Sequence, residues 1–172
     1  IDQKSDRVKL IFNNQAEYEC DFVIGADGTR SAVRKSILGN DEPEFSGYVA
    51  WRGVVPTDGL DESDFDECGS CAFISPGRVF ARYLIRDAKE YNYVAFLATD
   101  EWAEEGWSIP SKVETVLETF SDYNQQVKNI ISATPPEGCY KWGIFTRQPI
   151  AKWSSERVTL LGDAAHPLEP FM

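Results

Sequence analysis

The sequence is poor in the residues that build most metal and hydrolytic centres. Its 172 residues include a single histidine, His166, a single methionine and four cysteines. Only Cys68 and Cys71 form a CxxC pair, with no second pair to complete a zinc ribbon. One histidine cannot serve both a metal site and a Ser-His-Asp triad. We therefore predict no metal site and reduced cysteines, as in a cytoplasmic protein, with a redox CxxC as the alternative.

Long apolar segments are also missing. No run is long enough to span a bilayer, and no basic segment followed by an apolar one opens the chain, so neither membrane insertion nor a leader is expected. Acidic residues outnumber basic ones by 28 to 17, for a net charge of −11, which makes nucleic acids and anionic membranes poor partners. A hydrophobic content of 42% nevertheless predicts a packed core.

The two ends of the chain have the pattern of pieces of one nucleotide-binding domain. Near the start, strands are predicted at Val8–Phe12 and Tyr18–Ile24, followed by a Gly/Asp turn and a short helix that Ser31 caps and Gly39 ends. Near the end, a strand of the buried type at Arg157–Leu161 leads into a second Gly/Asp turn. The chain begins without Met and ends directly after that motif, so we expect a piece of a larger protein.

The middle of the chain has the pattern of an antiparallel sheet with helices. Strands are predicted at Tyr48–Val55, Cys71–Ser75, Arg78–Arg86, Tyr91–Ala98 and Tyr140–Phe145. Ser111 and Glu114 form a capping box before one helix, and Val127 and Ile130 mark a second helix. The acidic stretch from Pro56 to Glu67 predicts a solvated loop. Such an arrangement arises when a substrate domain, here residues 46–148, is inserted into a nucleotide-binding domain formed by residues 1–45 and 149–172.

Two apolar strands each end in a glycine–aspartate corner, one at Gly25-Ala26-Asp27-Gly28 and the other at Gly162-Asp163. Ligands of open α/β sheets bind beyond the carboxyl ends of the strands. Glycine lets the backbone approach a pyrophosphate, and a carboxylate accepts hydrogen bonds from sugar hydroxyls. Each corner alone is also a common structural turn. The prediction is therefore that the two corners converge in space around a single dinucleotide.

These corners also carry a resemblance to a known family. The segment from Asp27 to Arg34 resembles the DG motif of the class A flavoprotein hydroxylases, with matches at Asp27, Gly28, Ser31 and Arg34. The segment Gly162–Pro167 is similar to the GD motif of the same family. The segments Gly47–Gly53 and Arg147-Gln148-Pro149, with Trp153, resemble the salicylate hydroxylase-like and 2,6-dihydroxypyridine hydroxylase-like branch. The N-terminal GxGxxG turn of that family is absent from this sequence.

The resemblance implies a fold of mixed α+β and α/β class, a fragment of an FAD-binding, glutathione-reductase-like domain with an inserted antiparallel-sheet substrate domain. Asp163 would accept a hydrogen bond from a ribityl hydroxyl of FAD, and Pro167 would lie near the isoalloxazine ring. Asp27 would lie near the pyrophosphate, and Arg34 would pair with carboxylates or phosphate. The residues implied to bind the cofactor are Asp27, Gly28, Arg34, Gly162, Asp163, Ala164 and Pro167.

In such families the antiparallel sheet forms a wall over the flavin, and its inward side chains touch the substrate. The candidates here are Tyr83, Phe73, Tyr93 and Arg52. Tyr83 shares one face of its strand with Ala81 and Ile85, and plain sheet core is its alternative. Arg78, Arg82 and Arg86 take the opposite face, for which a solvated surface is the alternative. His166 borders the active site in related proteins, with a structural role as its alternative. The catalytic residue stays unassigned, with His166, Tyr83 and Arg52 as candidates.

The resemblance further implies a monooxygenase that hydroxylates a small aromatic compound with NADH or NADPH and O2, through a flavin C4a-hydroperoxide. We expect the fragment to be inactive alone. An epoxidase or another non-aromatic flavin monooxygenase, and a catalytically silent binding module on the same scaffold, are the alternatives. The sequence does not indicate the oligomeric state.

Overall fold

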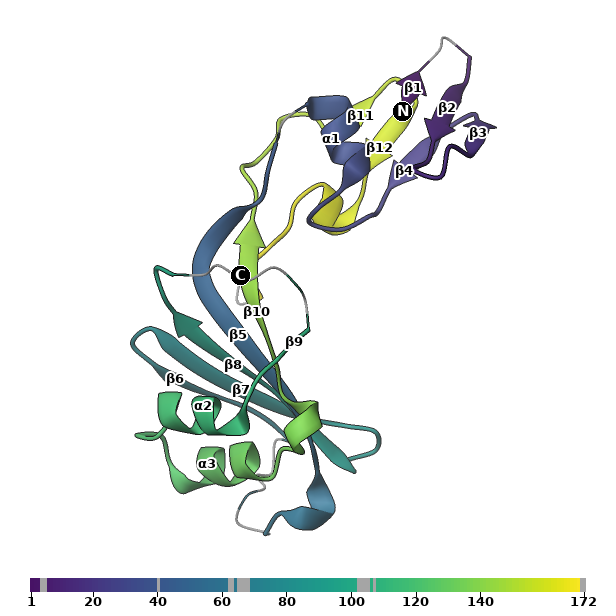
Figure 1. Cartoon of the computed structure of the whole chain (residues 1–172). Coiled ribbons are helices and arrows are strands. Elements are labelled where there is room, and N and C mark those ends of the chain that lie inside the picture. Colours follow the sequence, from purple (N-terminus) through teal and green to yellow (C-terminus); the bar gives the residue numbers. More distant parts are fainter. Residues whose placement is uncertain are drawn as a thin grey trace. The chain divides into compact units, whose positions relative to one another are not determined.

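The computed structural model divides the chain into two compact units. Unit 1 consists of Ile1–Ser46 with Phe145–Met172, and unit 2 of Gly47–Ile144 (Figure 1). The structure describes residues 1–3, 6–39, 41–61, 64, 69–101, 106 and 108–170. Cys68 of the CxxC pair lies outside the described residues, while Cys71 is a half-buried free thiol.

The described residues of unit 1 form two small sheets and one α-helix. The first sheet has the order β1-β2-β3, with the strands β1 (Asp2–Gln3), β2 (Val8–Ile11) and β3 (Glu17–Cys20). The second has the order β11-β12-β4, with the strands β4 (Val23–Gly25), β11 (Ser154–Ser155) and β12 (Val158–Leu160). The helix is α1 (Ala32–Leu38), and a short 3-10 helix, η4, covers Gly162–Ala164.

The strand predicted at Tyr18–Ile24 is wrong as a single element. Its first part is β3, which pairs antiparallel with β2, and its second part is β4, which pairs parallel with β12. The chain changes sheet at the bend between them, because Val23 is buried against Val158 and Val8 while Phe22 is exposed. The predicted helix is confirmed, since the Ser31 hydroxyl caps α1 and Gly39 ends it.

Unit 2 is built on a six-stranded sheet with the order β6-β7-β8-β5-β10-β9. Its strands are β5 (Glu44–Pro56), β6 (Ser70–Ser75), β7 (Arg78–Ile85), β8 (Glu90–Ala98), β9 (Ile109–Pro110) and β10 (Tyr140–Thr146). The pairs β6–β7, β7–β8, β5–β8 and β9–β10 are antiparallel, which confirms the predicted meander. Among the described residues of its loops lie the short 3-10 helices η1 (Thr57–Gly59) and η3 (Pro136–Gly138).

Helices α2 (Val113–Thr119) and α3 (Gln125–Ser132) cover one face of this sheet (Figure 1). The Phe80 ring of β7 lies 6.0 Å from Phe120 and 5.1 Å from Tyr93 of β8, with all three side chains fully buried. The predicted capping box is wrong, because Lys112 is the N-cap of α2 and provides no side-chain cap. The Ser111 hydroxyl instead accepts a hydrogen bond from the Trp51 indole at 3.1 Å.

The helix-covered face also corrects two expectations of solvent exposure. Arg82, expected on a solvated face, is fully buried and lies over the Tyr91 ring, 4.7 Å from its centroid. Asp64, expected in a solvated loop, is 3% exposed and accepts a hydrogen bond from the Asn129 amide at 2.9 Å. Elsewhere in that loop, Glu62, Asp66 and Glu67 lie outside the described residues, and Asp61 is exposed.

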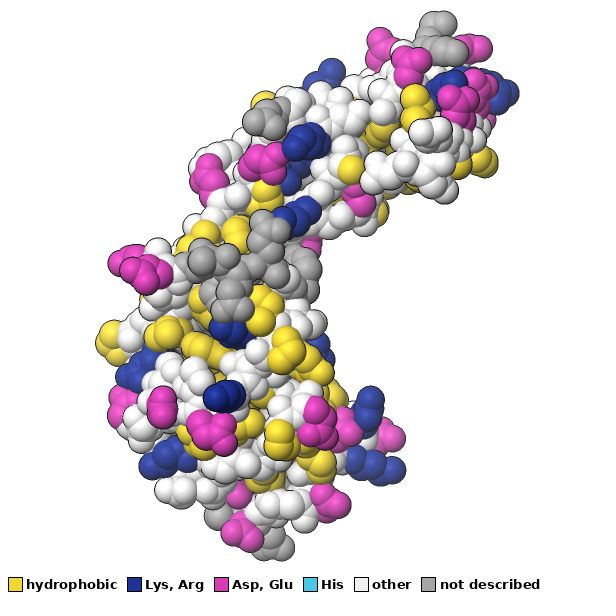
Figure 2. All heavy atoms as spheres, in the orientation of Figure 1, with side chains coloured by type: hydrophobic (Ala, Val, Ile, Leu, Met, Phe, Trp, Pro, Cys, Tyr) yellow, Lys and Arg dark blue, Asp and Glu magenta, His cyan; other side chains and the backbone are white. Residues whose placement is uncertain are grey.

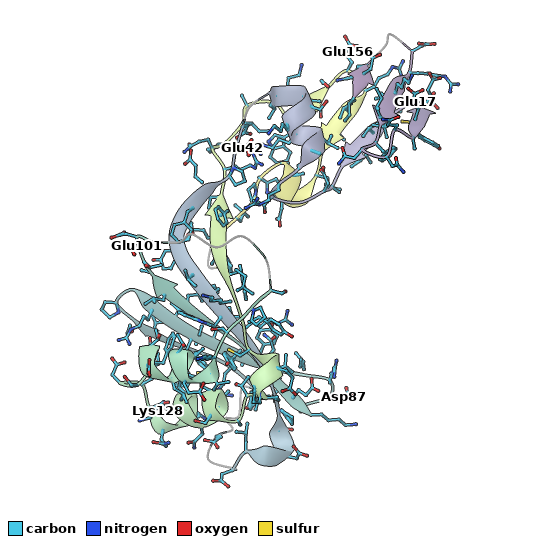
Figure 3. The ribbon with its side chains drawn as sticks, in the orientation of Figure 1. Glu17, Glu42, Asp87, Glu101, Lys128 and Glu156 are labelled. Carbon is cyan, nitrogen blue, oxygen red and sulfur yellow. The ribbon has the colours of Figure 1, made fainter. Side chains whose placement is uncertain are left out.

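The surfaces of both units carry interspersed acidic and basic side chains (Figure 2). Exposed pairs such as Lys35–Glu42, 2.7 Å apart, join neighbouring segments of unit 1 (Figure 3). Such pairs contribute little to stability because water screens them. Among the described helices, none has the length and apolar character needed to cross a membrane.

Candidate functional site

The two glycine–aspartate corners lie side by side in unit 1. Strands β4 and β12 are parallel neighbours in which Gly25 pairs with Leu160. The backbone N–H of Leu161 donates to the carbonyl oxygen of Gly25 at 2.9 Å, so the pairing includes the first residue of one corner and the residue just before the other. Both corners therefore leave the sheet at the carboxyl ends of adjacent parallel strands, where α/β sheets bind their ligands. The predicted convergence of the corners is confirmed.

In the first corner, the Asp27 carboxylate organises the start of α1. Its Oδ1 accepts a hydrogen bond from the Ser31 hydroxyl at 2.5 Å, and its Oδ2 accepts from the backbone N–H groups of Ala32 and Val33 at 2.8 and 3.1 Å. Gly28 has a φ of +79°, a conformation that favours glycine, and it completes the turn. Partial burial raises the pKa of Asp27, but the Ser31 and backbone hydrogen bonds outweigh it and hold the pKa below 3.8.

The hydrogen bonds to Asp27 predict a pH-dependent contribution to stability. An Asp27→Asn variant should lose about 1 kcal/mol of unfolding free energy at neutral pH, because an amide accepts fewer of these hydrogen bonds. Since the pKa is lowered on folding, the loss should stay constant down to about pH 5 and shrink as the native carboxylate becomes protonated at lower pH. Urea unfolding across this range measures it, and a deficit that persists unchanged below the ordinary value of 3.8 would contradict it.

Arg34 connects the first corner to the second. Its guanidinium is fully buried, and Nη1 donates to the carbonyl oxygens of Ala164 and Ala165 at 3.2 and 2.7 Å. Nη2 donates to the carbonyl oxygen of Gln148 at 3.2 Å, and Nε pairs with the Asp41 carboxylate at 2.5 Å. Arg34 thus pairs with a carboxylate of this chain, and its Nη1 hydrogen bonds hold the backbone just after the second corner.

Asp41 is a part of this site that the sequence did not reveal. Its carboxylate lies between two buried cations, Arg34 on α1 and Arg147 after β10, and the Arg147 side chain is 3% exposed. Arg147 also donates to the backbone carbonyls of Asp41 and of Thr29, the latter at 2.6 Å. The resemblance to a family motif at Arg147 marked the position, but nothing in the local pattern indicated an acidic partner 106 residues away.

The second corner keeps its backbone and its carboxylate open to solvent. Gly162 has a φ of +59°, and no heavy atom lies within 4 Å of the position that a Cβ would occupy. Asp163 is exposed, while Ala164 and Pro167 are buried behind it. These features fit a nucleotide cofactor, because the backbone can be approached closely and the carboxylate is free to accept hydrogen bonds from hydroxyl groups.

His166 is held beside this corner by two contacts. Its backbone N–H donates to the carbonyl oxygen of Gly162 at 3.0 Å, and its exposed ring stacks on Trp153, with centroids 4.7 Å apart. The stack therefore fixes the direction of the imidazole by packing.

The substrate-facing candidates of unit 2 fall on opposite faces of its sheet. Phe73 and Tyr93 have the same side-chain direction as Phe80 and pack on the helix-covered face, which corrects the expectation that they face a ligand. Tyr83 and Arg52 lie on the other face. There the two strands that carry them flank Asn92 of β8, which pairs with Tyr83 on one side and with Val54 on the other.

A pocket of about 480 Å³ opens beside Arg52 within unit 2. Its described lining residues are Arg52, Val54, Ser108, Glu137, Gly138, Tyr140 and Trp142. It therefore combines one cation and one carboxylate with two aromatic side chains, a composition that can hold a small aromatic ligand. The sequence pattern had singled out Arg52 alone, because Tyr140 and Trp142 come from a strand far away in the chain.

Known proteins resemble the chain over nearly its whole length. The profile of a family described as an FAD binding domain matches residues 2–172. The 3-amino-4-hydroxybenzoate 2-monooxygenase PtnB3 of Streptomyces platensis is 35% identical over 171 residues, which cover 99% of this chain and 42% of that protein. The 6-hydroxynicotinate 3-monooxygenase of Bordetella bronchiseptica is also 35% identical, over 100% of this chain and 44% of its own length.

Solved structures agree with these sequence relatives. A salicylate hydroxylase in complex with its substrate superimposes with a TM-score of 0.82 and 25% identity, over 98% of this chain and 45% of that one. The predicted fold class, a fragment of an FAD-binding aromatic hydroxylase fold, is confirmed. The chain thus spans less than half the length of each of these three relatives.

Proposed function

We propose, from the premise that this chain belongs to the FAD binding domain family, that the whole protein is an FAD-dependent monooxygenase. It would hydroxylate a small aromatic compound with O2 and NADH or NADPH. The observation that carries the proposal is the convergence of the two corners at the ends of β4 and β12, with the Gly162–Asp163 backbone and carboxylate open to a ligand. The names of the three relatives described above, two monooxygenases and one hydroxylase, support the reaction class.

In this proposal unit 1 is part of the FAD-binding domain and unit 2 is the substrate domain. Gly162 would allow close approach of the cofactor, and Asp163 would accept a hydrogen bond from one of its hydroxyl groups. Asp27 and Gly28 would shape the first corner. Arg34 would act indirectly, because its hydrogen bonds hold the backbone of Ala164 and Ala165 in place. The buried Ala164 and Pro167 would support this wall of the site. The chemistry that bound FAD would supply is reduction of the flavin by NAD(P)H and activation of oxygen.

The protein's own tasks are to orient the aromatic ring and to exclude water around it. The face of the unit 2 sheet opposite α2 and α3, with Arg52 and Tyr83, would provide the orientation. His166, held on Trp153, would lie on the flavin side of unit 1, and no residue is assigned as a general base. The three free cysteines among the described residues, Cys20, Cys71 and Cys139, support a reducing, cytoplasmic location.

The proposal is tested on the product of the complete reading frame. The wild-type protein should be yellow, with the visible absorption of oxidised flavin, and should consume O2 and NAD(P)H with a phenolic acid. Asp163→Ala should weaken FAD binding by about 10- to 100-fold, because it removes an acceptor of a charge-assisted hydrogen bond. Glu156→Ala, which removes an exposed carboxylate from the same unit, is the control and should retain FAD (Figure 3). A colourless, folded wild-type protein that takes up no added FAD would refute the proposal.

A further inference from the structure

We infer that the complete protein forms a dimer in which strand β6 of unit 2 pairs antiparallel with the β6 strand of a second copy. The two six-stranded sheets would then join edge to edge. Three features of β6 support this pairing: a free edge, a sequence without charge, and an exposed isoleucine. The pairing is independent of the proposed function, because it involves neither corner of unit 1 and no cofactor.

Strand β6 (Ser70–Ser75) is an outer strand of the sheet, and β7 is the one described strand that pairs with it (Figure 1). The backbone N–H of Leu84 donates to the carbonyl oxygen of Gly69 at 2.9 Å, just before β6 begins. Hydrogen-bonded pairs alternate with non-hydrogen-bonded pairs along an antiparallel ladder, so every second residue from Gly69 bonds to β7. The backbone groups that point away from β7 therefore belong to Ser70, Ala72 and Ile74. Within the described ranges, no group of another segment bonds to them.

Strand β6 lacks the features by which natural proteins block a free sheet edge. Such features include charged residues, proline and bulges within the edge strand. The segment Ser70–Ser75 contains no charged residue and no proline, and it pairs with β7 residue by residue, without a bulge. The Ile74 side chain is 77% exposed, more than any other large hydrophobic side chain that the structure describes. The edge is therefore open to another strand, and covering Ile74 would stabilise the pairing.

The strand is complementary to itself when it meets its own copy about a two-fold axis. With the axis at Ala72, this residue faces its own copy, and Ser70 of each strand faces Ile74 of the other. Each of these hydrogen-bonded pairs exchanges two hydrogen bonds, about six in all, so every outward-facing backbone group of β6 has a partner. Moving the axis along the strand would leave some of these groups unpaired. A two-fold interface uses the same surface of both copies, so the association ends at a dimer.

The distribution of charge favours a second copy at this edge. The chain carries a net charge of −11, so two copies repel each other over most approaches. The segment from Gly69 to Gly77 contains no charged residue, so two β6 strands can meet without opposing like charges. The size of the contact is also sufficient, because about six hydrogen bonds lie within the range of about 5–15 found in specific interfaces.

The test places single cysteines along β6 in the complete protein, in which Cys68→Ser and Cys71→Ser remove the neighbouring thiols. Ala72→Cys puts two thiols on the two-fold axis, where the Cα atoms of a hydrogen-bonded pair lie about 5.5 Å apart, within reach of a disulfide. Mild oxidation should therefore link this variant into a covalent dimer on a non-reducing gel. Ser70→Cys is the control, because its two copies would lie more than about 12 Å apart along the strands and should stay unlinked.

Sedimentation equilibrium of proteins without added cysteines measures the association itself. Ala72→Glu should weaken the dimer by at least about 10-fold, because it opposes two like charges directly across the new ladder. Ala98→Glu, which adds the same charge at an exposed residue of β8, should leave the association unchanged. A monomeric wild type, as expected if a part of the complete protein outside residues 1–172 covers the edge, would overturn the inference. A dimer that Ala72→Glu does not weaken, or equal cross-linking of Ala72→Cys and Ser70→Cys, would also overturn it.

Discussion

Replacing Arg34 by methionine is expected to lower the free energy of unfolding by about 3–5 kcal/mol, because it breaks a buried ion pair and leaves its partners without donors. The variant retains an unbranched apolar stem but deprives Asp41 of one of its cations. It also leaves the carbonyl oxygens of Ala164, Ala165 and Gln148 without the hydrogen bonds that Arg34 donates. Urea unfolding of the complete protein, followed by tryptophan fluorescence, measures this loss.

Lys35→Met is the matched control, because it removes a cation from the next residue of the same helix. The Lys35 side chain is 59% exposed and pairs with Glu42 on the surface, so its loss should barely change the unfolding midpoint. FAD affinity should fall in Arg34→Met and stay unchanged in Lys35→Met, because Arg34 fixes the backbone that follows Asp163. An Arg34 variant as stable as the control would show that the hydrogen bonds between the corners contribute nothing to folding.

The role of Arg34 illustrates what a sequence pattern can and cannot predict at this site. The pattern identified both corners, because a glycine–aspartate turn after an apolar strand is a local signal. It associated Arg34 with a carboxylate or phosphate, but whether the guanidinium meets a ligand or the chain depends on burial. The acceptor nearest to Arg34 in sequence, Asp41, is 7 residues away, and the most distant one, Ala165, is 131 residues away. No window of local sequence contains both.

Secondary structure shows the same division between local and distant causes. The hairpin strands of unit 2 were predicted within one or two residues, since alternation and turn residues act over short distances. Ser31 caps α1 as predicted because its partner, the Arg34 N–H, lies within the same turn. Ser111 is an equally suitable N-cap residue by sequence, but it does not cap α2. Its hydroxyl instead accepts a hydrogen bond from the Trp51 indole, 60 residues away in sequence.

The sequence predicted which side chains share a face of the unit 2 sheet, but it did not predict which face is buried. Alternation along a strand indicates which residues share a face, so it correctly separated Tyr83 from Arg82. It does not indicate which face the helices cover, and the arginine face proved to be the buried one at Arg82. For the same reason Phe73 and Tyr93 were misplaced as ligand contacts, since their burial depends on Phe80 and on helices that come later in the chain.

The helix-covered face also leads to a prediction for Gly53, which pairs with Tyr93 between β5 and β8. A Cβ at Gly53 would lie 2.4 Å from Cε1 of the Tyr93 ring, far inside van der Waals contact. The ring cannot easily move, because it stacks on Phe80 and its hydroxyl is 3.1 Å from that of Thr134. We therefore expect Gly53→Ala to destabilise the protein by about 3 kcal/mol, as overpacking of a rigid core does.

Two further variants establish whether the Tyr93 ring causes this loss. Gly59→Ala is the control, because no atom lies within 4 Å of its Cβ position and the turn there is exposed, so stability should change by less than about 1 kcal/mol. Tyr93→Leu removes the ring, so adding Gly53→Ala to it should cost far less than in the wild type, a non-additivity that urea unfolding of all four proteins measures. Additive losses would mean that Gly53 is required for another reason. Coupling through Tyr93 would instead show that close approach of β5 and β8 sets the shape of the sheet whose opposite face presents Arg52.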